Sequence, residues 1–293
     1  MSDTNLTDEL AHGEALLIEG MADEAQELFA RLAEDAEEYV DRNCPTTDAV
    51  QWFSFPTLFE RLAYRRVEGD PRDLRDVGEP LDRLYGDLAL AAVRNGDYDG
   101  AMAALRQAVR WNPMGCEWRL NLADLYRIKG DPNEYLALTF SVFSRASDAR
   151  HLVRAFTNFS EYFLVAEKSA AAAAALRVAR RFGLPDAQLD AALDLATETD
   201  HDPDTVTDDE ARDLLAAEGL PDGANAEVAV CLLMCATDAA AEGDRNTATN
   251  LTVRARDLVG DEACKALIKL MRESDAEMAE AADDASEGDG ADA

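Results

Sequence analysis

Residues 85–113 read YGDLALAAVRNGDYDGAMAALRQAVRWNP, and this stretch decides the fold. Gly96-Asp97 interrupts the helical spacing, because a glycine-aspartate pair supports a turn that a helix interior does not tolerate. Asn112-Pro113 closes a unit of about 34 residues, a repeat length typical of helical hairpins. Small residues recur where two helices must approach closely, at Ala89, Ala101 and Ala108. The stretch therefore predicts two antiparallel helices that form one unit of a repeat.

The same pattern returns at residues 116–143, which read CEWRLNLADLYRIKGDPNEYLALTFSVF. In these two units the sequence resembles the tetratricopeptide repeat family. The first unit carries the family pattern at Tyr85, Leu88, Ala89, Gly96, Asp97, Tyr98, Ala101, Leu105, Ala108 and Pro113. The second carries it at Leu122, Ala123, Tyr126, Gly130 and Asp131. Tyr135 stands where the family has a small residue, so we expect the second hairpin to pack more loosely or in a shifted register.

Weaker copies of the pattern occur on both sides and extend the resemblance to roughly two thirds of the chain. The copy before the central units includes Gly13, Leu16, Gly20, Ala25, Phe29 and Leu32. The copies after them include Phe156, Phe159, Ser160, Phe163, Ala172, Leu176 and Ala179, and then Leu232, Ala236, Gly243, Asp244, Ala248 and Ala255. The resemblance implies an all-α fold, a right-handed α-solenoid of stacked helical hairpins. The lack of alternating β-branched segments agrees with an all-α chain.

Composition narrows the function classes. The 293 residues carry a formal net charge of −32, and a phosphate backbone needs a basic surface, so general nucleic-acid binding is not expected. Residues 101–185 nevertheless hold 12 Lys and Arg against 7 Asp and Glu, which makes the middle mildly basic. The acidity around it fits solubility, a salt-rich or acid-biased host, or electrostatic steering, and the sequence leaves these open.

The five cysteines and the ends of the chain predict a cellular compartment. An odd number of dispersed cysteines favours reduced thiols over a disulfide framework. The N-terminus has no basic and apolar signal-peptide pattern, and no segment has the length of a membrane span. We therefore expect a soluble cytoplasmic protein without membrane contact and without a cofactor.

Turn signals divide the chain into three predicted parts. An array of hairpins is expected over residues 1–198, further helical hairpins over residues 199–273, and a disordered acidic tail over residues 274–293, which cannot bury an apolar face. In the aromatic stretch around residues 52–64, Pro56 predicts either a kink or a short helix that ends near Phe55. The next helix is expected from about Pro71 to Leu84.

Three constellations invite a chemical interpretation, and each has a simpler alternative. Carboxylates alternate in residues 200–204 as in a calcium loop, but the sixth and twelfth places lack the required Gly and Glu, so a capping box at Thr207 and Glu210 is favoured. Cys231 and Cys235 lie one helical turn apart among apolar neighbours, which favours buried thiols over a zinc site. We interpret the three histidines as structural or surface residues, at His12, His151 and His201.

The repeat register also predicts a peptide-binding groove. In the resembled family, fixed positions on the first helix of each repeat line a concave face. The amide and basic residues at those positions here, which suit the backbone and carboxylates of an extended peptide, are Arg94, Asn121, Arg127, Arg154 and Asn158. Asn121 and Arg154 match two places of the clamp by which some family members hold a terminal carboxylate, whereas Gly86 and Leu90 stand where that clamp has Lys and Asn.

These observations predict a non-enzymatic scaffold or adaptor that binds a peptide or helix of a partner protein, including an acidic or carboxylate-ended segment. Two alternatives stay open. One is an enzyme with an acidic site on a helical scaffold, which requires a pocket with convergent polar groups and perturbed pKa values. The other is a structural protein that self-assembles through residues 52–64. The partner's identity and the oligomeric state are left open.

Overall fold

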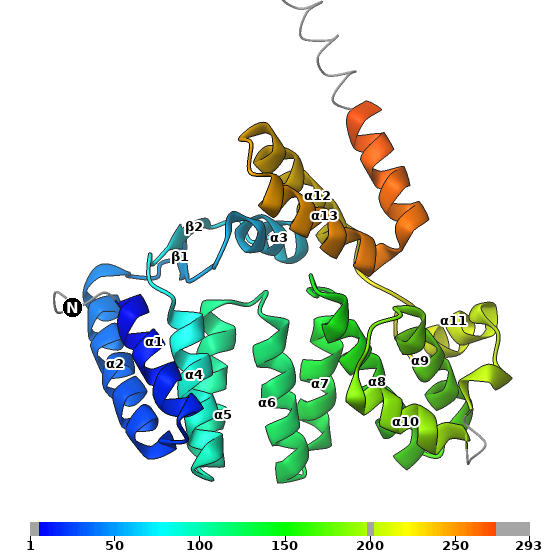
Figure 1. Cartoon of the computed structure of the whole chain (residues 1–293), viewed down its shortest axis with the longest axis horizontal. Helices are drawn as coiled ribbons and strands as arrows, with labels where there is room; N and C mark the ends of the chain where they lie inside the picture. Colours follow the sequence, from blue (N-terminus) through cyan, green and yellow to red (C-terminus); the bar gives the residue numbers. More distant parts are fainter. Residues whose placement is uncertain (1–5, 198–201, 274–293) are drawn as a thin grey trace, which may run out of the picture.

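The computed structural model describes residues 6–197 and 202–273 and consists mainly of antiparallel helical hairpins. The hairpins stand side by side with their tight turns along one edge, the lower edge in Figure 1. The array contains α1 (Leu6–Ile18), α2 (Ala22–Asn43), α4 (Leu81–Arg94), α5 (Tyr98–Trp111), α6 (Cys116–Lys129), α7 (Pro132–Val142), α8 (Ala149–Val165), α9 (Ser169–Arg181), α10 (Ala187–Thr197), η1 (Pro203–Thr205) and α11 (Asp208–Ala217). The predicted all-α solenoid is confirmed.

The Gly-Asp pairs form the hairpin turns. Gly96 adopts a φ of 76°, which only glycine reaches without strain, and the Asp97 side chain then accepts a hydrogen bond from the Gly100 amide at 2.9 Å. Gly130-Asp131 and Gly243-Asp244 repeat the arrangement at the starts of α7 and α13 (Arg245–Val259). One dipeptide therefore both ends the first helix of a hairpin and caps the second.

Small residues bring the helices of a hairpin together as the repeat pattern predicted. Ala101 and Ala108 are completely buried, and Ala89 is 2% exposed. The second hairpin accommodates its larger residue by burying it: the Tyr135 hydroxyl donates to the Asn158 carbonyl on α8 at 3.3 Å. Tyr135 therefore joins α7 to the following hairpin.

A segment between α2 and α4 departs from the repeat and differs from its sequence prediction. It forms a parallel strand pair, β1 (Val50–Phe53) and β2 (Asp73–Asp76), with α3 (Leu58–Glu68) between them. Pro56 neither kinks nor ends a helix, because α3 begins after it with a capping box of Thr57 and Glu60. The helix expected from Pro71 is instead β2 and a loop, and α4 starts at Leu81.

A buried polar network fixes this inserted segment to the hairpin of α4 and α5, here called the central hairpin. The Ser54 hydroxyl donates to the Glu79 carbonyl at 2.7 Å and accepts from the Leu81 amide at 2.9 Å. Asn112, which follows the end of α5, donates from Nδ2 to Asp82 Oδ2 in the first turn of α4 at 3.0 Å. Because these groups are buried and partnered, they determine where the insertion lies on the array.

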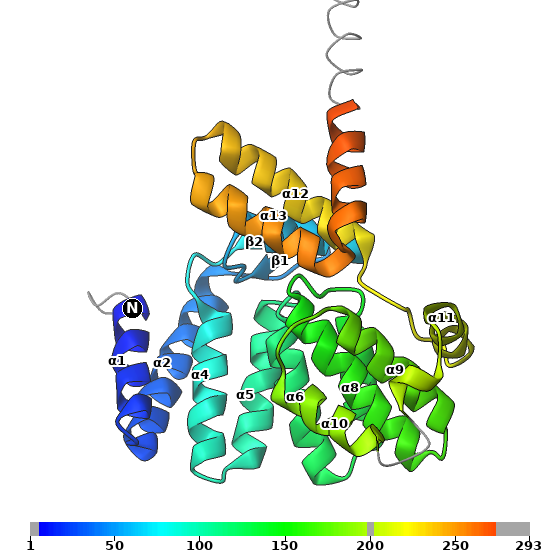
Figure 2. The same ribbon diagram turned by 45° about the vertical axis from the view of Figure 1, so that its right-hand side comes forward.

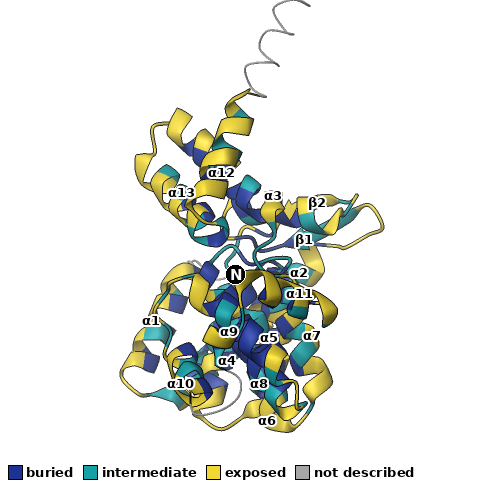
Figure 3. Ribbon diagram, turned by 90° about the vertical axis from the view of Figure 1, so that its right-hand side faces the viewer, coloured by how far each residue is buried: buried dark blue, intermediate teal, exposed yellow. Residues whose placement is uncertain are grey.

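The C-terminal hairpin folds back onto the insertion. In Figures 1 and 2, α12 (Ala226–Ala241) and α13 lie above the array beside α3, and residues 261–273 form a further helix, here called the final helix. Arg66 on α3 pairs with Glu227 on α12 at 2.5 Å, and the Arg254 guanidinium lies 5.3 Å from the centre of the Phe59 ring. Figure 3 shows buried positions inside the array and again where α3 meets α12.

The aromatic stretch at residues 52–64 belongs to this core. Phe53, Phe55, Phe59 and Tyr64 are each at most 8% exposed and share one apolar cluster with residues of α8, α9 and α12. These four rings therefore offer no free surface for the predicted alternative of self-assembly.

Two further predictions concern residues that the structure does not describe. The domain boundary at residue 199 and the acidic tail at residues 274–293 fall outside residues 6–197 and 202–273, and the three-part division stays a prediction. Within those two ranges, no helix combines the length and the apolar character that crossing a membrane requires.

Candidate functional site

The first helices of successive hairpins, α6 and α8, present interlocked polar side chains. Arg154 on α8 reaches back to α6, where its Nη1 donates to Asn121 Oδ1 at 3.0 Å and its Nη2 contacts Asp124 Oδ2 at 2.6 Å. Asn121 and Arg154, which were both predicted to face the groove, lie 33 positions apart in sequence and are in direct contact. The contact arises because stacked hairpins place equivalent helices side by side.

Arg127 extends this polar row toward the turn between α6 and α7. Its Nη1 lies 3.2 Å from Glu161 on α8, and its Nη2 lies 3.9 Å from Asp124. About half of the Arg127 side chain, 49%, is exposed, as is 38% of Glu161. An ion pair this exposed contributes little to stability, so a competing carboxylate can replace Glu161 at small cost.

Asn158 lies beneath the row and not on its surface. Its residue is fully buried, and its Oδ1 accepts a hydrogen bond from Gln188 Nε2 of α10 at 3.2 Å. Gln188 also donates to Glu161 at 3.1 Å. Asn158 therefore supports the row through Gln188, and a bound peptide could reach it only after Gln188 moves.

Arg94 lies apart from the other predicted residues. Its Nη1 donates to the carbonyl of Leu17 near the end of α1, so it caps that helix instead of joining Arg127 and Arg154. Of the five residues predicted for the groove, the structure thus brings together Asn121, Arg127, Arg154 and Asn158.

The carboxylate and amide partners were missed by the sequence reasoning, which selected only arginine and asparagine. Asp124 occupies one of the groove-facing positions of its repeat, so its place in the register was a usable signal. Glu161 offered the same signal, because it lies 34 residues, one repeat, after Arg127. Gln188 had no comparable signal, because its contacts depend on how α10 packs against α8. In the polar row, two arginines and two carboxylates offset each other: Arg127, Arg154, Asp124 and Glu161.

A small pocket adjoins the row where α6 turns into α7. Its volume is about 300 Å³, and both Arg127 and Glu161 line it. The rest of its lining is mostly apolar and consists of Gly130, Pro132, Tyr135, Tyr162 and Val165. A charged pair beside an apolar pocket can contact both a polar group and an apolar side chain of one ligand.

Two positions, Gly86 and Leu90, depart from the carboxylate clamp, and the structure explains the departure at Gly86. A Cβ added to Gly86 would lie 2.5 Å from the ring of Trp118, so the indole of α6 occupies the space above α4. A lysine at this place would displace that ring. Leu90, at the second place, is 44% exposed. At Gly86, therefore, α4 packs closely against α6 and leaves no room for the lysine of the clamp.

The α1 end of the same face is acidic. Arg83 pairs with Glu14 and lies 3.9 Å from Asp87, whose side chain is only 16% exposed. Burial, followed by repulsion from Glu14, raises the pKa of Asp87 to about 7. This carboxyl group consequently titrates near neutral pH and resists ionisation more than a surface aspartate does.

The structure describes most residues of the remaining constellations. Thr207 and Glu210 form the favoured capping box, whereas Asp200 and His201 lie outside the described residues. The two cysteines of α12 are free thiols, of which Cys231 is buried, whereas Cys235 is only partly buried. Within residues 6–197 and 202–273, no three His, Cys, Asp or Glu side chains come together as metal ligands.

The two remaining histidines differ in environment. His12 is exposed on α1, although the repeat pattern suggests a core residue there. Burial lowers the pKa of His151 to about 4, so its imidazole is neutral at physiological pH. His151 therefore supplies no titrating base near neutral pH.

Stacked hairpins with capped Gly-Asp turns and alanine contacts define a helical-repeat protein. Comparison with protein families agrees, because residues 82–113, which span α5 and all but the first residue of α4, match the tetratricopeptide repeat family. The hairpin of α4 and α5 is therefore similar to a tetratricopeptide repeat, a family whose members are generally non-enzymatic scaffolds for other proteins. No curated protein matches the chain at a significant level.

Proposed function

We propose that the protein is a non-enzymatic scaffold or adaptor that binds a peptide or helix of a partner protein on the concave face formed by its first helices. The observation that supports this proposal is the polar row across α6, α8 and α10, which ends at an apolar pocket beside Arg127. Such a face gives amide and charged groups to a peptide backbone and an apolar site to one side chain.

The preferred partner segment carries a carboxylate, either in a side chain or at its end. Arg127 is half exposed, and its pair with Glu161 is weak, so an incoming carboxylate can take the place of Glu161. Because the protein as a whole is strongly negative, an acidic partner is repelled at long range. Recognition must then depend on short-range contacts, which favours selective binding over fast association.

The proposal also places the protein in the cytoplasm. All five cysteines are free thiols, and four of them, Cys44, Cys116, Cys231 and Cys264, are buried with raised pKa values, mainly because of burial. Protonated, buried thiols of this kind persist in a reducing compartment.

Affinity capture from the native lysate with Arg127→Ala combined with Arg154→Ala tests the proposal. We expect the affinity for the captured partner to fall about tenfold or more, because two charge-assisted hydrogen-bonding groups are removed. A control variant, Arg31→Ala with Arg65→Ala, removes the same charge from exposed positions of α2 and α3 and should retain the partner. If the first double variant binds its partner at wild-type affinity with unchanged helical content, the polar row is not the binding face.

A further inference from the structure

The last hairpin, formed by α12 and α13, repeats the sequence pattern of the central hairpin, formed by α4 and α5. With Gly96 aligned to Gly243, the contact alanines of the central hairpin, Ala89, Ala101 and Ala108, correspond to Ala236, Ala248 and Ala255. Both glycines have positive φ, and the aspartate that follows each one caps the second helix. In the same alignment the final helix is the counterpart of α6.

In the central hairpin, α6 fills the groove between α4 and α5. Leu122 and Leu125 of α6 are buried in one cluster with Ala89, Met102 and Leu105. Trp118, a further turn back, covers Gly86. The apolar side chains of α6 thus follow helical spacing, at i, i+4 and i+7, and cover the groove.

In the last hairpin the corresponding groove stays open. The places of Trp118, Leu122 and Leu125 are taken in the final helix by Lys265, Lys269 and Arg272. Thr249 and Thr252 replace Met102 and Leu105 on the second helix. The final helix packs instead through Leu267, Ile268 and Met271, which are partly buried.

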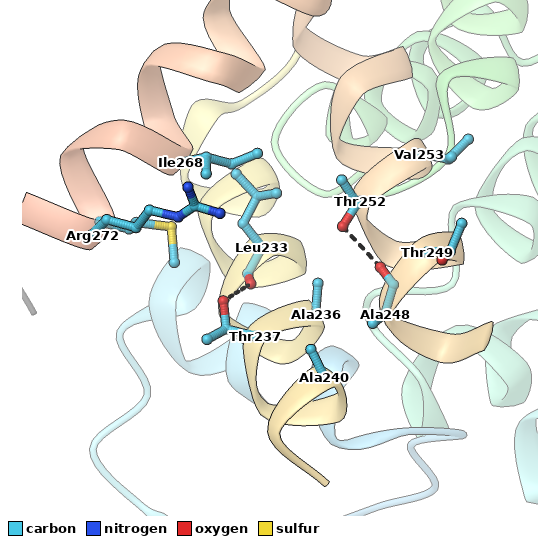
Figure 4. A pocket seen from close by; sticks show the side chains of 11 residues that line it. Leu233, Ala236, Thr237, Ala240, Ala248, Thr249, Thr252, Val253, Ile268 and Arg272 are labelled. Carbon is cyan, nitrogen blue, oxygen red and sulfur yellow. Dashed lines mark hydrogen bonds between the residues drawn. The ribbon is translucent and has the colours of Figure 1, made fainter. Parts of the chain in front are cut away.

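The result is a groove of about 490 Å³ between α12, α13 and the final helix (Figure 4). Its lining is Leu233, Ala236, Thr237, Ala240, Ala248, Thr249, Thr252, Val253, Ile268, Met271 and Arg272. The Thr237 and Thr252 hydroxyls donate to the carbonyls of Leu233 and Ala248, at 3.0 and 2.8 Å, within their own helices. Since these hydroxyls are already bonded, the walls favour an apolar occupant.

We propose that this groove binds an amphipathic α-helix of a partner protein whose apolar stripe is flanked by carboxylates. The central hairpin shows the occupant that suits such a groove, a helix with large apolar residues at i, i+4 and i+7. Arg272 lines the groove, and Lys265 and Lys269 precede it at helical spacing, so three cations follow one stripe of the final helix in a strongly anionic protein.

The ion pairs already present along the final helix do not prevent a bound helix from contacting its lysines. Lys269 lies 3.6 Å from Glu273 and is 76% exposed, and Lys265 pairs with Asp261 and Glu262 at the surface. Exposed pairs between neighbouring turns are weak, so carboxylates of a bound helix can compete for these cations. This surface is separate from the polar row around Arg127 and would give the scaffold a second binding site.

Two synthetic peptides of the length of α6 test the proposal with the full chain. Both carry Trp, Leu and Leu at the spacing of Trp118, Leu122 and Leu125, and their flanking positions hold glutamate in one and lysine in the other. Fluorescence anisotropy should show that the glutamate peptide binds about tenfold more tightly or better. Lys269→Glu with Arg272→Glu should reverse that preference, and equal binding of both peptides to the wild-type chain would contradict it.

Matched variants locate the site. Thr249→Trp places an indole in the groove and should abolish binding, whereas Asn250→Trp, at an exposed position outside the groove lining, should leave it unchanged. Both positions are exposed, so the fold is retained, as circular dichroism can check. Binding that is insensitive to Thr249→Trp, or lost in the Arg127→Ala, Arg154→Ala variant, overturns the assignment of this groove.

Two other occupants would also overturn it. If the glutamate peptide binds only after residues 274–293 are removed, the chain's own acidic tail is the occupant. If the wild-type chain dimerises with rising concentration and Thr249→Trp abolishes the dimer, the occupant is a second copy. Tight binding to the full-length monomer supports the partner helix.

Discussion

The central and last hairpins share a turn, a cap and a set of contact alanines, yet one groove is a core and the other is a surface. In the central hairpin Ala101 is completely buried, whereas its counterpart Ala248 lines an open groove. The difference lies in the following helix, which offers Leu122 and Leu125 in one case and Lys269 and Arg272 in the other. The repeat pattern therefore determines the hairpin, and the next helix determines whether its groove is closed.

The sharpest way to break this comparison is to enlarge the same alanine in both hairpins. Ala101→Leu should destabilise the protein by about 1–3 kcal/mol, because the added atoms overpack a closed helix contact. Ala248→Leu should change the free energy of unfolding by less than about 0.5 kcal/mol, because its side chain extends into open space. Chemical denaturation of both variants measures the difference. Equal effects would mean that the two grooves are filled alike.

A smaller change in stability is expected from the titration of Asp87. Its counterpart in the last hairpin is Met234, a residue that does not titrate. The pKa of Asp87 in the folded protein is about 7, above its ordinary value of 3.8. Between these two values the folded state binds more protons than the unfolded state, so the stability contributed by this group falls as the pH rises from about 4 to about 7. Above pH 7 the buried carboxylate is fully destabilising.

Asp87→Asn should remove this dependence. We expect the variant and the wild type to be equally stable near pH 4, and the variant to be more stable by about 1–2 kcal/mol at pH 8. Denaturation midpoints across the pH range provide the measurement, and Met234→Gln serves as the control at the corresponding position. A difference that does not vary with pH would show that Asp87 titrates as an ordinary surface group.

The smallest effect is expected from removing residues 274–293. These residues contain eight Asp and Glu and no Lys or Arg, and a segment that cannot bury an apolar face does not support a core. The melting temperature should therefore stay essentially unchanged. A loss of several degrees would show that the tail covers part of the molecule.

Most of the array could be predicted because its signals are local. Gly96-Asp97 and Ala101 specify a turn and a close contact within one hairpin, and both are confirmed. The insertion could not be predicted in the same way, since β1 and β2 pair across an intervening helix. One local signal there was missed: Thr57 and Glu60 form a capping box directly after Pro56, which marks the start of α3 and not a kink.

The candidate site could also be predicted only in part. Asn121 and Arg154 fall into contact because the repeat register places them on adjacent first helices. Asn158 obeys the same register but is buried, because α10 crosses α8 and covers it with Gln188. Arg94 satisfies the carbonyl end of α1 instead. Register predicts which face a residue occupies, but the neighbouring helix decides whether it stays accessible.

The docking of α12 on α3 also has a consequence for synthesis on the ribosome. Arg66 meets Glu227, 161 residues later, and the helices of the array are made in between. At about 5–20 residues per second, α3 waits on the order of ten to thirty seconds for its partner helix. The local hairpins can form as they emerge, whereas the apolar face of α3 around Phe59 is completed only after α12 and α13 are translated. The docking of α12 on α3 is thus a contact of high contact order, and the nascent chain must keep that face from aggregating until it forms.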